Sequence, residues 1–355
     1  MNYIWSKKSL LEFIEKSINS VVKEKDYIFS DLFAGTGIVG RYFKEKWHRV
    51  IANDLQYYSF VLNRNYIWNH KILWFFGLQK EIPELFVSDL HSTTDLVLDY
   101  LNNLKWKKGF IYKNYAVWGT KWKEFERMYF SDENAKICDS VRDKIEDWKK
   151  EELITEDEYY FLLASLIESI DKVANTASVY GAFLKQLKKS AQKVMILKPA
   201  EFYLNDNEHD VYNKDVNELI LESSHDVVYL DPPYNHRQYS GNYHILETIA
   251  KADKPRIKGK TGMRDCSGQK SDYSKRNDVK KSFSHLIQNI DAKYVFLSYN
   301  CEWLLSLDDI EEVMSKRWEY GVFKKDYRRF KADKTKSRNY KKNSVTEYLH
   351  YVKIK

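Results

Sequence analysis

The sequence has few cysteines, which limits the kinds of site it can build. Its 3 cysteines, Cys138, Cys266 and Cys301, are odd in number, widely spaced and in no Cys-x-x-Cys pair. Neither a disulfide framework nor a structural zinc site is indicated, and we expect no metal. A chain without disulfides suits a reducing compartment, so the expected location is cytoplasmic.

Long hydrophobic runs are also missing. Residues 1–18 carry charges between Lys7 and Lys16 and contain no apolar run of the signal-peptide type. No later segment approaches the length needed to span a bilayer. We therefore expect a soluble intracellular protein with no membrane partner.

Glycine and proline are scarce, whereas aromatic residues are abundant. The chain of 355 residues has 12 Gly and 5 Pro against 27 Tyr, 18 Phe and 10 Trp, and 43% of it is hydrophobic. This composition excludes disorder as the main state and allows one large core or two smaller ones. The net charge of +7, from 58 Lys+Arg and 51 Asp+Glu, fits a polyanionic partner without requiring one.

The segment 27–54 predicts a strand, a glycine turn, a helix and a second strand. An apolar run ends at Asp31, the turn Gly35-Thr36-Gly37 follows, a helix reaches about Lys46, and 49–53 forms the next strand. This is a βαβ unit. The predicted fold class is therefore α/β, with a parallel sheet covered by helices.

The alternation of strands and helices then stops and later resumes. Residues 69–193 contain no second βαβ pattern and are predicted to be largely helical, with helices at 121–150 and 155–173. Residues 251–281 are polar and rich in Lys and Arg, which predicts a long mobile loop. The strands expected after the helical region lie at 226–230, 293–298 and 348–354.

The turn after Asp31 is suited to a nucleoside-containing ligand. Glycines let the backbone approach a ligand closely, and the start of the next helix offers N–H groups. Gly35, Gly37 and Gly40 formally match the Gly-x-Gly-x-x-Gly dinucleotide pattern, which leaves a nicotinamide or flavin oxidoreductase open. Asp54, at the end of the second strand, is placed to accept hydrogen bonds from ribose hydroxyls in either case.

The segment Asp231-Pro232-Pro233-Tyr234 directly follows an apolar strand and indicates catalysis on an amine. Consecutive prolines fix the backbone and remove two N–H donors, so the local carbonyls become rigid acceptors. An aminated base could donate one N–H to the Asp231 carboxylate and the other to the Pro232 carbonyl, while Tyr234 stacks on its face. Both acceptors localise the nitrogen lone pair, which makes the amine a nucleophile. The predicted catalytic residues are Asp231, Pro232, Pro233 and Tyr234.

The order of these motifs resembles that of the Dam-like, or alpha-group, N6-adenine-specific DNA methyltransferases of the restriction-modification type. A Lys-containing segment at 3–10, the Asp-x-Phe-x-Gly-x-Gly turn, an acidic second strand, a recognition region and Asp-Pro-Pro-Tyr occur in the family's order. The resemblance implies a Rossmann-like S-adenosylmethionine-dependent methyltransferase fold with a mostly helical inserted target-recognition domain. It divides the chain into catalytic parts at 1–69 and 195–355 and the inserted domain at 70–194.

The resemblance also implies S-adenosyl-L-methionine as the cofactor. The N-terminal motif would touch the cofactor's methionine end, although Trp5 stands where the family usually has Gly. Asp215 would accept from the cofactor's adenine amino group, and 327–348 resembles closing strands in which an aromatic helps to hold a flipped base. The implied cofactor-binding residues are Ser6, Lys7, Asp31, Phe33, Gly35, Gly37, Asp54, Asp215 and Asp231.

Asp231 also bears on which base is methylated. By resemblance, enzymes acting on the cytosine amino group usually have Ser before Pro-Pro-Tyr, and those acting on protein glutamine have Asn, so Asp231 favours adenine N6. No Pro-Cys pair is present, which excludes C5-cytosine methylation. Cytosine N4, an RNA adenine and a non-catalytic DNA-binding module of the same fold stay as alternatives.

The helical insertion favours duplex DNA as the partner. Residues 105–123 interleave lysines with Trp, Phe and Tyr, and two further segments, 180–193 and 251–281, are rich in basic residues. No nuclease site is fused to the chain, so any cognate restriction endonuclease would be a separate protein. The predicted DNA contacts are Lys107, Lys108, Lys113, Lys185, Lys188, Lys258, Lys260 and Arg264.

Overall fold

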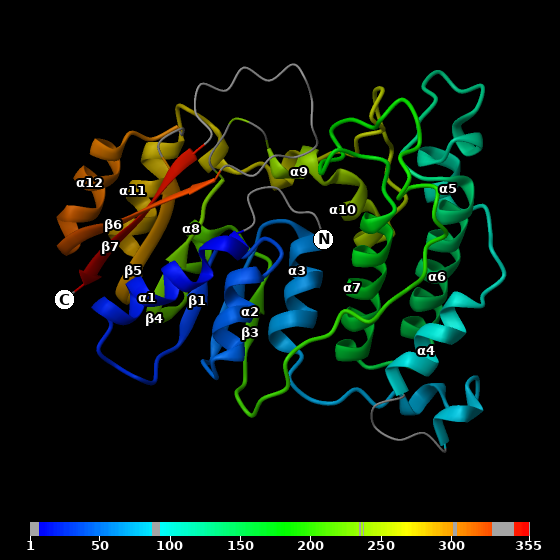
Figure 1. Cartoon of the computed structure of the whole chain (residues 1–355), viewed down its shortest axis with the longest axis horizontal. Helices are drawn as coiled ribbons and strands as arrows, with labels where there is room; N and C mark the ends of the chain where they lie inside the picture. The colour runs from blue at the N-terminus through cyan, green and yellow to red at the C-terminus, as the bar shows by residue number, and fades with distance from the viewer. Residues whose placement is uncertain are drawn as a thin grey trace. The chain divides into compact units, whose positions relative to one another are not determined.

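The computed structural model describes residues 7–86, 93–233, 236, 238–300, 304–328 and 344–354. These form two compact units, each assembled from separate stretches of sequence (Figure 1). The sheet unit takes its described residues from Trp5–Asn63, Asn207–Tyr239 and Gly268–Lys355. The helical unit takes them mainly from Arg64–Asp206 and Ser240–Ser267.

The sheet unit is built on a 7-stranded sheet with the strand order β3-β2-β1-β4-β5-β7-β6. The first five strands in this order are parallel, and β7 is antiparallel to both of its neighbours. The carboxyl ends of the parallel strands therefore meet at one edge. The strands are β1 (Phe29–Asp31), β2 (Val50–Asn53), β3 (Asp210–Tyr212), β4 (Ser224–Leu230), β5 (Asp291–Asn300), β6 (Trp318–Arg328) and β7 (Ser344–Ile354).

Helices cover both faces of this sheet, which is why its central strands are apolar on both sides. On β4, Val228 and Leu230 join a core cluster with residues of α11 such as Phe283. On β1, the Phe29 ring instead stacks on Phe43 of α2, with ring centroids 3.7 Å apart. The helices of this unit are α1 (Leu11–Val21), α2 (Ile38–Glu45), α3 (Tyr57–Asn63), α8 (Val216–Leu219), α11 (Val279–Asn289) and α12 (Leu307–Met314).

The predicted α/β fold is confirmed, and so are its main strands. The strand ending at Asp31, the strand at 49–53 and the runs at 226–230 and 293–298 correspond to β1, β2, β4 and β5. The predicted final strand at 348–354 is part of a longer strand, β7. Because β6 and β7 close the sheet as an antiparallel pair, the sheet is mostly and not wholly parallel.

The helical unit has helices packed on one another and no strand longer than an isolated bridge among its described residues. Its longest helices, α6 and α7, contact each other, and both bury apolar side chains such as Trp148 and Leu166. Its helices are α4 (Thr93–Asn102), α5 (Phe110–Tyr115), α6 (Asp132–Lys150), α7 (Glu156–Lys172) and α10 (His244–Lys251), with α9 (Tyr239–Asn242) at the boundary of the two units.

One of the two helices predicted here needs correction. The helix expected at 155–173 is present as α7, and a capping box between Thr155 and Glu158 fixes its start. The helix expected at 121–150 begins only at Asp132, because Ser131 caps it by accepting from the Asn134 N–H. Before that cap the chain turns at Trp122, whose φ of 64° is left-handed.

The segment 251–281, predicted as a long mobile loop, has a defined structure. Lys258 and Met263 pair through two backbone hydrogen bonds of 2.8 and 2.9 Å. The Arg127 guanidinium donates to the carbonyls of Gly259 and Lys260, which ties this turn to the helical unit. Residues up to Ser267 therefore lie in the helical unit, although we assigned them to the second catalytic part.

Candidate active site

Two glycines shape the turn between β1 and α2. Gly35 and Gly37 have φ angles of 53° and 74°, in the left-handed region that side chains disfavour. A Cβ atom added to Gly37 would lie 2.5 Å from Oδ1 of Asn63. The Asn63 amide donates back to the Gly35 carbonyl, so the turn is held against α3 as well as β1. Gly37 is therefore required both by backbone conformation and by space.

Asp31, at the end of β1, is almost completely buried at 1% exposure. Its Oδ2 accepts from the Gly40 N–H across 3.3 Å, and its Oδ1 has no hydrogen-bond partner among the described residues. Burial raises the pKa of Asp31 to about 8, and the nearby carboxylates of Asp231 and Asp54 add to that shift. A buried acid with an unsatisfied oxygen is suited to a cationic or N–H-bearing ligand.

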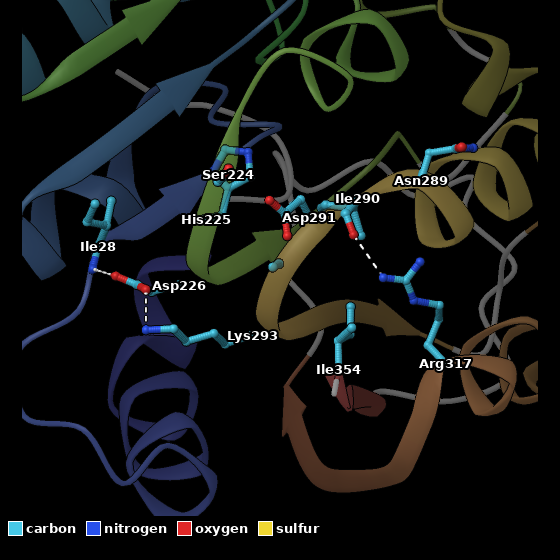
Figure 2. Close-up of a pocket in the computed structure, with 11 residues that line it drawn as sticks. Ile28, Ser224, His225, Asp226, Asn289, Ile290, Asp291, Lys293, Arg317 and Ile354 are labelled. Atoms are coloured by element: carbon cyan, nitrogen blue, oxygen red, sulfur yellow. Dashed lines mark hydrogen bonds and ion pairs between the residues drawn. The ribbon is translucent and has the colours of Figure 1, made fainter.

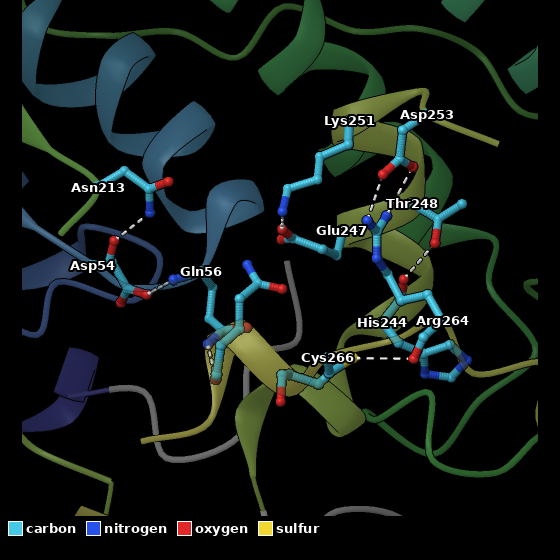
Figure 3. Close-up of polar contacts among 12 residues, drawn as sticks. Asp54, Gln56, Asn213, His244, Glu247, Thr248, Lys251, Asp253, Arg264 and Cys266 are labelled. Carbon is cyan, nitrogen blue, oxygen red and sulfur yellow. Dashed lines mark hydrogen bonds and ion pairs between the residues drawn. The ribbon is translucent and has the colours of Figure 1, made fainter. Parts of the chain in front are cut away.

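Asp54 lies just beyond β2 and organises the turn (Figure 3). Its Oδ2 accepts from the Gly35 N–H and its Oδ1 from the Gln56 N–H, both across 2.8 Å. Its own carbonyl accepts from the Asn213 amide across 2.7 Å. Asp54 thus joins the ends of β1, β2 and β3 at one edge of the sheet, and its predicted ribose contact stays a prediction.

Asp215 and Phe33 lie on the other parts of the same edge. The Asp215 carboxylate caps α8 by accepting from the Asn217 N–H across 2.8 Å. Phe33 is partly buried and meets the Tyr273 ring edge-on, with centroids 5.0 Å apart. Both residues are fixed by contacts within the chain, and their predicted cofactor contacts remain untested.

Asp231 directly follows β4, as the sequence predicted, and a buried lysine pairs with it. The Lys7 ammonium, which is 6% exposed, lies 3.2 Å from Oδ1 of Asp231 and 2.6 Å from Oε1 of Glu347. The same Glu347 oxygen accepts from the Ser298 hydroxyl across 2.6 Å. A cation and two acids from η1 (Lys7–Leu10), β4 and β7 therefore meet at the carboxyl edge of the sheet.

Burial and the two neighbouring charges together set the protonation of Asp231. Burial raises the pKa of Asp231 to about 7, while Lys7 lowers it and Glu347 raises it. Burial would lower the pKa of Lys7, but the carboxylates of Asp231 and Glu347 raise it well above its usual range. Lys7 therefore stays charged, and Asp231 can exchange a proton near neutral pH.

Sequence reasoning found Asp231 and Lys7 but missed Glu347 and Ser298. Lys7 had been expected to touch the cofactor, whereas its ammonium contacts two acids. A signal for Glu347 was available, because in the alternating strand it shares a face with Leu349, which is fully buried. Ser6 and Tyr234, also predicted in the site, lie outside the described residues.

A pocket in the sheet unit lies at the opposite edge, where β4 and β5 begin (Figure 2). It is lined by Asp226, Asp291 and Lys293 among others. Asp226 accepts from the Ile28 N–H across 2.9 Å and pairs with Lys293 across 2.8 Å. Ligands of open α/β sheets bind at the carboxyl ends of strands, so this pocket is not the candidate site.

Comparison with known families decides the class of this site. The model of the D12 class N6 adenine-specific DNA methyltransferases matches residues 3–314, a range that includes the glycine turn and Asp231. The chain belongs to this family. The methyltransferase resembles curated proteins over its full length, which agrees with the family match.

Three relatives illustrate this similarity. The type II methyltransferase M.NlaIII of Neisseria lactamica is 49% identical over 352 residues, covering 99% of this chain and 98% of the relative. M.CviAII of Paramecium bursaria Chlorella virus 1 is 35% identical, covering 100% and 98%. M.FokI of Planomicrobium okeanokoites is 36% identical, covering 99% of this chain but 52% of the relative.

The lysines predicted to contact DNA differ in how they are engaged. Lys113, Lys185, Lys258 and Lys260 are exposed. Three others have partners: Lys107 pairs with Asp143, Lys188 donates to the Thr176 carbonyl, and Lys108 lies 5.6 Å from the centre of the Tyr112 ring. For all of them DNA contact stays a prediction.

Arg264 is placed differently from these lysines. It is 8% exposed, and both terminal nitrogens bind the Asp253 carboxylate at 3.0 and 2.5 Å (Figure 3). This paired geometry is typical of a structural arginine, because the guanidinium fork is already occupied. A DNA contact by Arg264 would require that pair to open.

Two structural features are absent from the described part of the methyltransferase. None of its helices is long and apolar enough to cross a membrane. Within the same ranges, no group of His, Cys, Asp and Glu side chains is arranged to hold a metal ion.

Proposed function

We propose that this methyltransferase uses S-adenosyl-L-methionine to methylate the N6 amino group of an adenine flipped out of duplex DNA. The observation that carries the proposal is the Asp231 carboxylate, which follows β4, precedes two prolines and pairs with the buried Lys7. The proposed reaction uses no metal ion, because it depends on positioning the amine and on hydrogen bonds to its N–H groups.

Asp231 and Pro232 supply the two acceptors that the amine needs. One N–H donates to the Asp231 carboxylate and the other to the Pro232 carbonyl, so the lone pair is drawn out of conjugation with the ring. When bound, the cofactor would supply an electron-poor methyl group on a sulfonium sulfur, and this sulfur would keep the electron pair of the S–C bond as a neutral thioether. The amine nitrogen forms the new N–C bond, and one of its protons passes to Asp231.

The residues at the carboxyl edge fit such a cofactor. The unsatisfied Oδ1 of buried Asp31 can accept from an ammonium group, and the Gly37 turn has no room for a side chain. Asp54 and Asp215 lie at the neighbouring strand ends and offer carboxylates to hydroxyl and amino donors. Gly35, Phe33, Lys7 and Asp231 complete the described residues that we assign to cofactor binding, and Ser6 lies outside the described residues.

The helical unit supplies a surface that suits duplex DNA. Arg127 donates to the Gly259 and Lys260 carbonyls, and the Tyr115 hydroxyl donates to the Gly262 carbonyl across 2.8 Å. The Tyr115 bond joins the lysine-rich segment at 105–123 to the turn that carries Lys258 and Lys260, and the Arg127 bonds hold the same turn from just after that segment. Trp118 and Trp122, at 65% and 86% exposure, stand on the same segment and offer flat faces to bases.

The biological setting we propose is restriction-modification. The support is that M.NlaIII and M.CviAII, which match over almost their whole lengths, are both named type II methyltransferases. A cognate endonuclease would then be a separate protein that reads the same sequence.

The experiment that tests the proposal uses cofactor carrying a labelled methyl group and duplex DNA of mixed sequence. Nucleoside digestion and mass spectrometry should detect labelled N6-methyladenine. Label found in N4-methylcytosine would mean that cytosine, and not adenine, is the target base. Label found only in RNA would mean that RNA, and not DNA, is the substrate. Absence of label from every nucleoside, with the cofactor bound, would leave a non-catalytic DNA-binding module.

A further inference from the structure

Glu347 is a buried acid in the segment 327–348, and the resemblance gives it no role. It lies on β7, opposite Asn300 of β5, and is 2% exposed. One of its oxygens, Oε1, accepts from both the Lys7 ammonium and the Ser298 hydroxyl, each across 2.6 Å. Burying a carboxylate is costly, and two short hydrogen bonds are the kind of compensation it requires.

Lys7 makes Glu347 relevant to the reaction. The lysine side chain has a flexible four-carbon stem and three donors, so a single contact would not fix its ammonium group. Here the ammonium is held by Glu347 at 2.6 Å and lies 3.2 Å from Oδ1 of Asp231. Ser298 in turn holds the Glu347 oxygen, so the chain of contacts runs from β5 through β7 to the end of β4.

We propose that Glu347 is a positioning residue for methyl transfer, which holds Lys7 so that one oxygen of Asp231 is fixed and the other faces the amine. The inference rests on the function proposed above and names a further residue for the same site. Asp231 would touch the amine, whereas Glu347 would act only through Lys7. Its loss should therefore affect turnover more than the binding of either substrate.

Charged and titratable groups reach Asp231 from several elements. Lys7 comes from η1, Glu347 from β7, Tyr229 from β4 and Asp31 from β1. The Lys7 cation favours the ionised carboxylate of Asp231, whereas the Glu347 anion opposes it. Removing each charge should therefore move the titration of Asp231 in opposite directions.

The test compares Glu347→Ala, Glu347→Gln and Lys7→Met in the full-length enzyme, with kcat and both KM values measured over a series of pH values. Glu347→Ala should lower kcat on the order of 100-fold, because an error of about 1 Å in a reacting group has that effect. Both KM values should change little. Glu347→Gln keeps an acceptor for Lys7 and should recover most of the lost kcat.

The pH profiles separate positioning from a structural role. Lys7→Met should move the acid limb of kcat to higher pH by about 1 to 3 units, since a close opposite charge has that effect on a carboxyl pKa. Glu347→Gln should move the same limb to lower pH. A residue that only stabilised the fold would shift the unfolding temperature and leave the acid limb in place.

A matched control is available near the start of β4, at the end opposite to Asp231. Asp226 also pairs with a lysine, Lys293, but at the opposite edge of the sheet (Figure 2). Asp226→Asn should leave the acid limb unchanged even if it lowers stability. Provided that the wild type methylates DNA, the inference is overturned if Glu347→Ala has the wild-type kcat. It is also overturned if Glu347→Gln is folded, as judged by its unfolding temperature, and has the acid limb of the wild type. A wild type that labels no DNA would instead overturn the proposed function.

Discussion

The backbone N–H of Gly35 donates to Oδ2 of Asp54 across 2.8 Å, so the acid beyond β2 holds the glycine turn beyond β1. This contact gives Asp54 two tasks in the proposed site. It shapes the turn that would approach the cofactor, and we predict that its carboxylate also accepts from the ribose hydroxyls of the cofactor.

Replacing Asp54 with Ala should weaken cofactor binding by about 1.5 to 3 kcal/mol, because hydrogen bonds to a charged group are lost. Isothermal titration calorimetry with S-adenosylmethionine measures this directly. Asp210→Ala is the control, since Asp210 pairs with Arg49 where β3 begins and lies away from the carboxyl edge. An unchanged affinity in Asp54→Ala would remove Asp54 from the cofactor site.

Replacing Asp231 with Ala should abolish turnover while leaving most of the cofactor affinity. The variant loses an acceptor for the amine, and this loss raises the free energy of the transition state more than that of the bound cofactor. Single-turnover methylation of DNA together with the calorimetric titration distinguishes the two effects. Near-normal methylation by the variant would show that Asp231 does not orient the amine.

Asp31 should make the stability of the cofactor-free protein fall as the pH rises. Its pKa of about 8 in the fold lies above the ordinary value of 3.8, so the folded state binds more protons between these values than the unfolded state. The free energy of unfolding should then decrease with a slope of at most about 1.4 kcal/mol per pH unit over that window.

Urea unfolding at several pH values checks this, with Asp31→Asn expected to flatten the slope. Asp309 offers a control of opposite sign, because Lys280 and Ser306 lower its pKa to about 2. Asp309→Asn should reduce stability only above the acid range and should leave the Asp31 slope intact. An Asp31→Asn protein with the wild-type slope would mean that Asp31 is ionised in the fold.

The turn carrying Lys258 and Lys260 should contribute to DNA affinity without contributing to cofactor affinity. Replacing both lysines with Gln should lower the slope of log affinity against log salt by about 1.8, which corresponds to two lost phosphate contacts. Fluorescence anisotropy with duplex DNA at several salt concentrations measures the slope. Lys280→Gln, on α11 and paired with two acids, is the control for loss of charge.

Local signals predicted much of this protein because they act over short distances. The apolar runs located β1, β2, β4 and β5, and the helical pattern at 155–173 located α7. The glycine turn and Asp231 were placed at the carboxyl edge because parallel strands end together. These features depend on neighbours a few residues away.

Other features depend on contacts between distant segments, which one sequence does not reveal. Lys7 and Glu347 are 340 residues apart, so the buried pair beside Asp231 could not be deduced from spacing. Arg264 carries a charge that suggested DNA, but Asp253 already occupies its guanidinium. The helix predicted from residue 121 failed because Ser131 provides a stronger start than the residues before it.

The return of Ser240–Ser267 to the helical unit has a consequence for exchanging this unit, which we propose to be the recognition part, between relatives. Arg142 of α6 donates to the carbonyls of Ile249 and Ala250, so this late segment completes the interior of a unit begun at Arg64. A chimera that transplants only residues 70–194 would separate Arg142 from the native segment whose backbone accepts its hydrogen bonds. Grafts intended to exchange recognition should therefore carry both stretches, with junctions at Arg64, Asp206, Ser240 and Ser267.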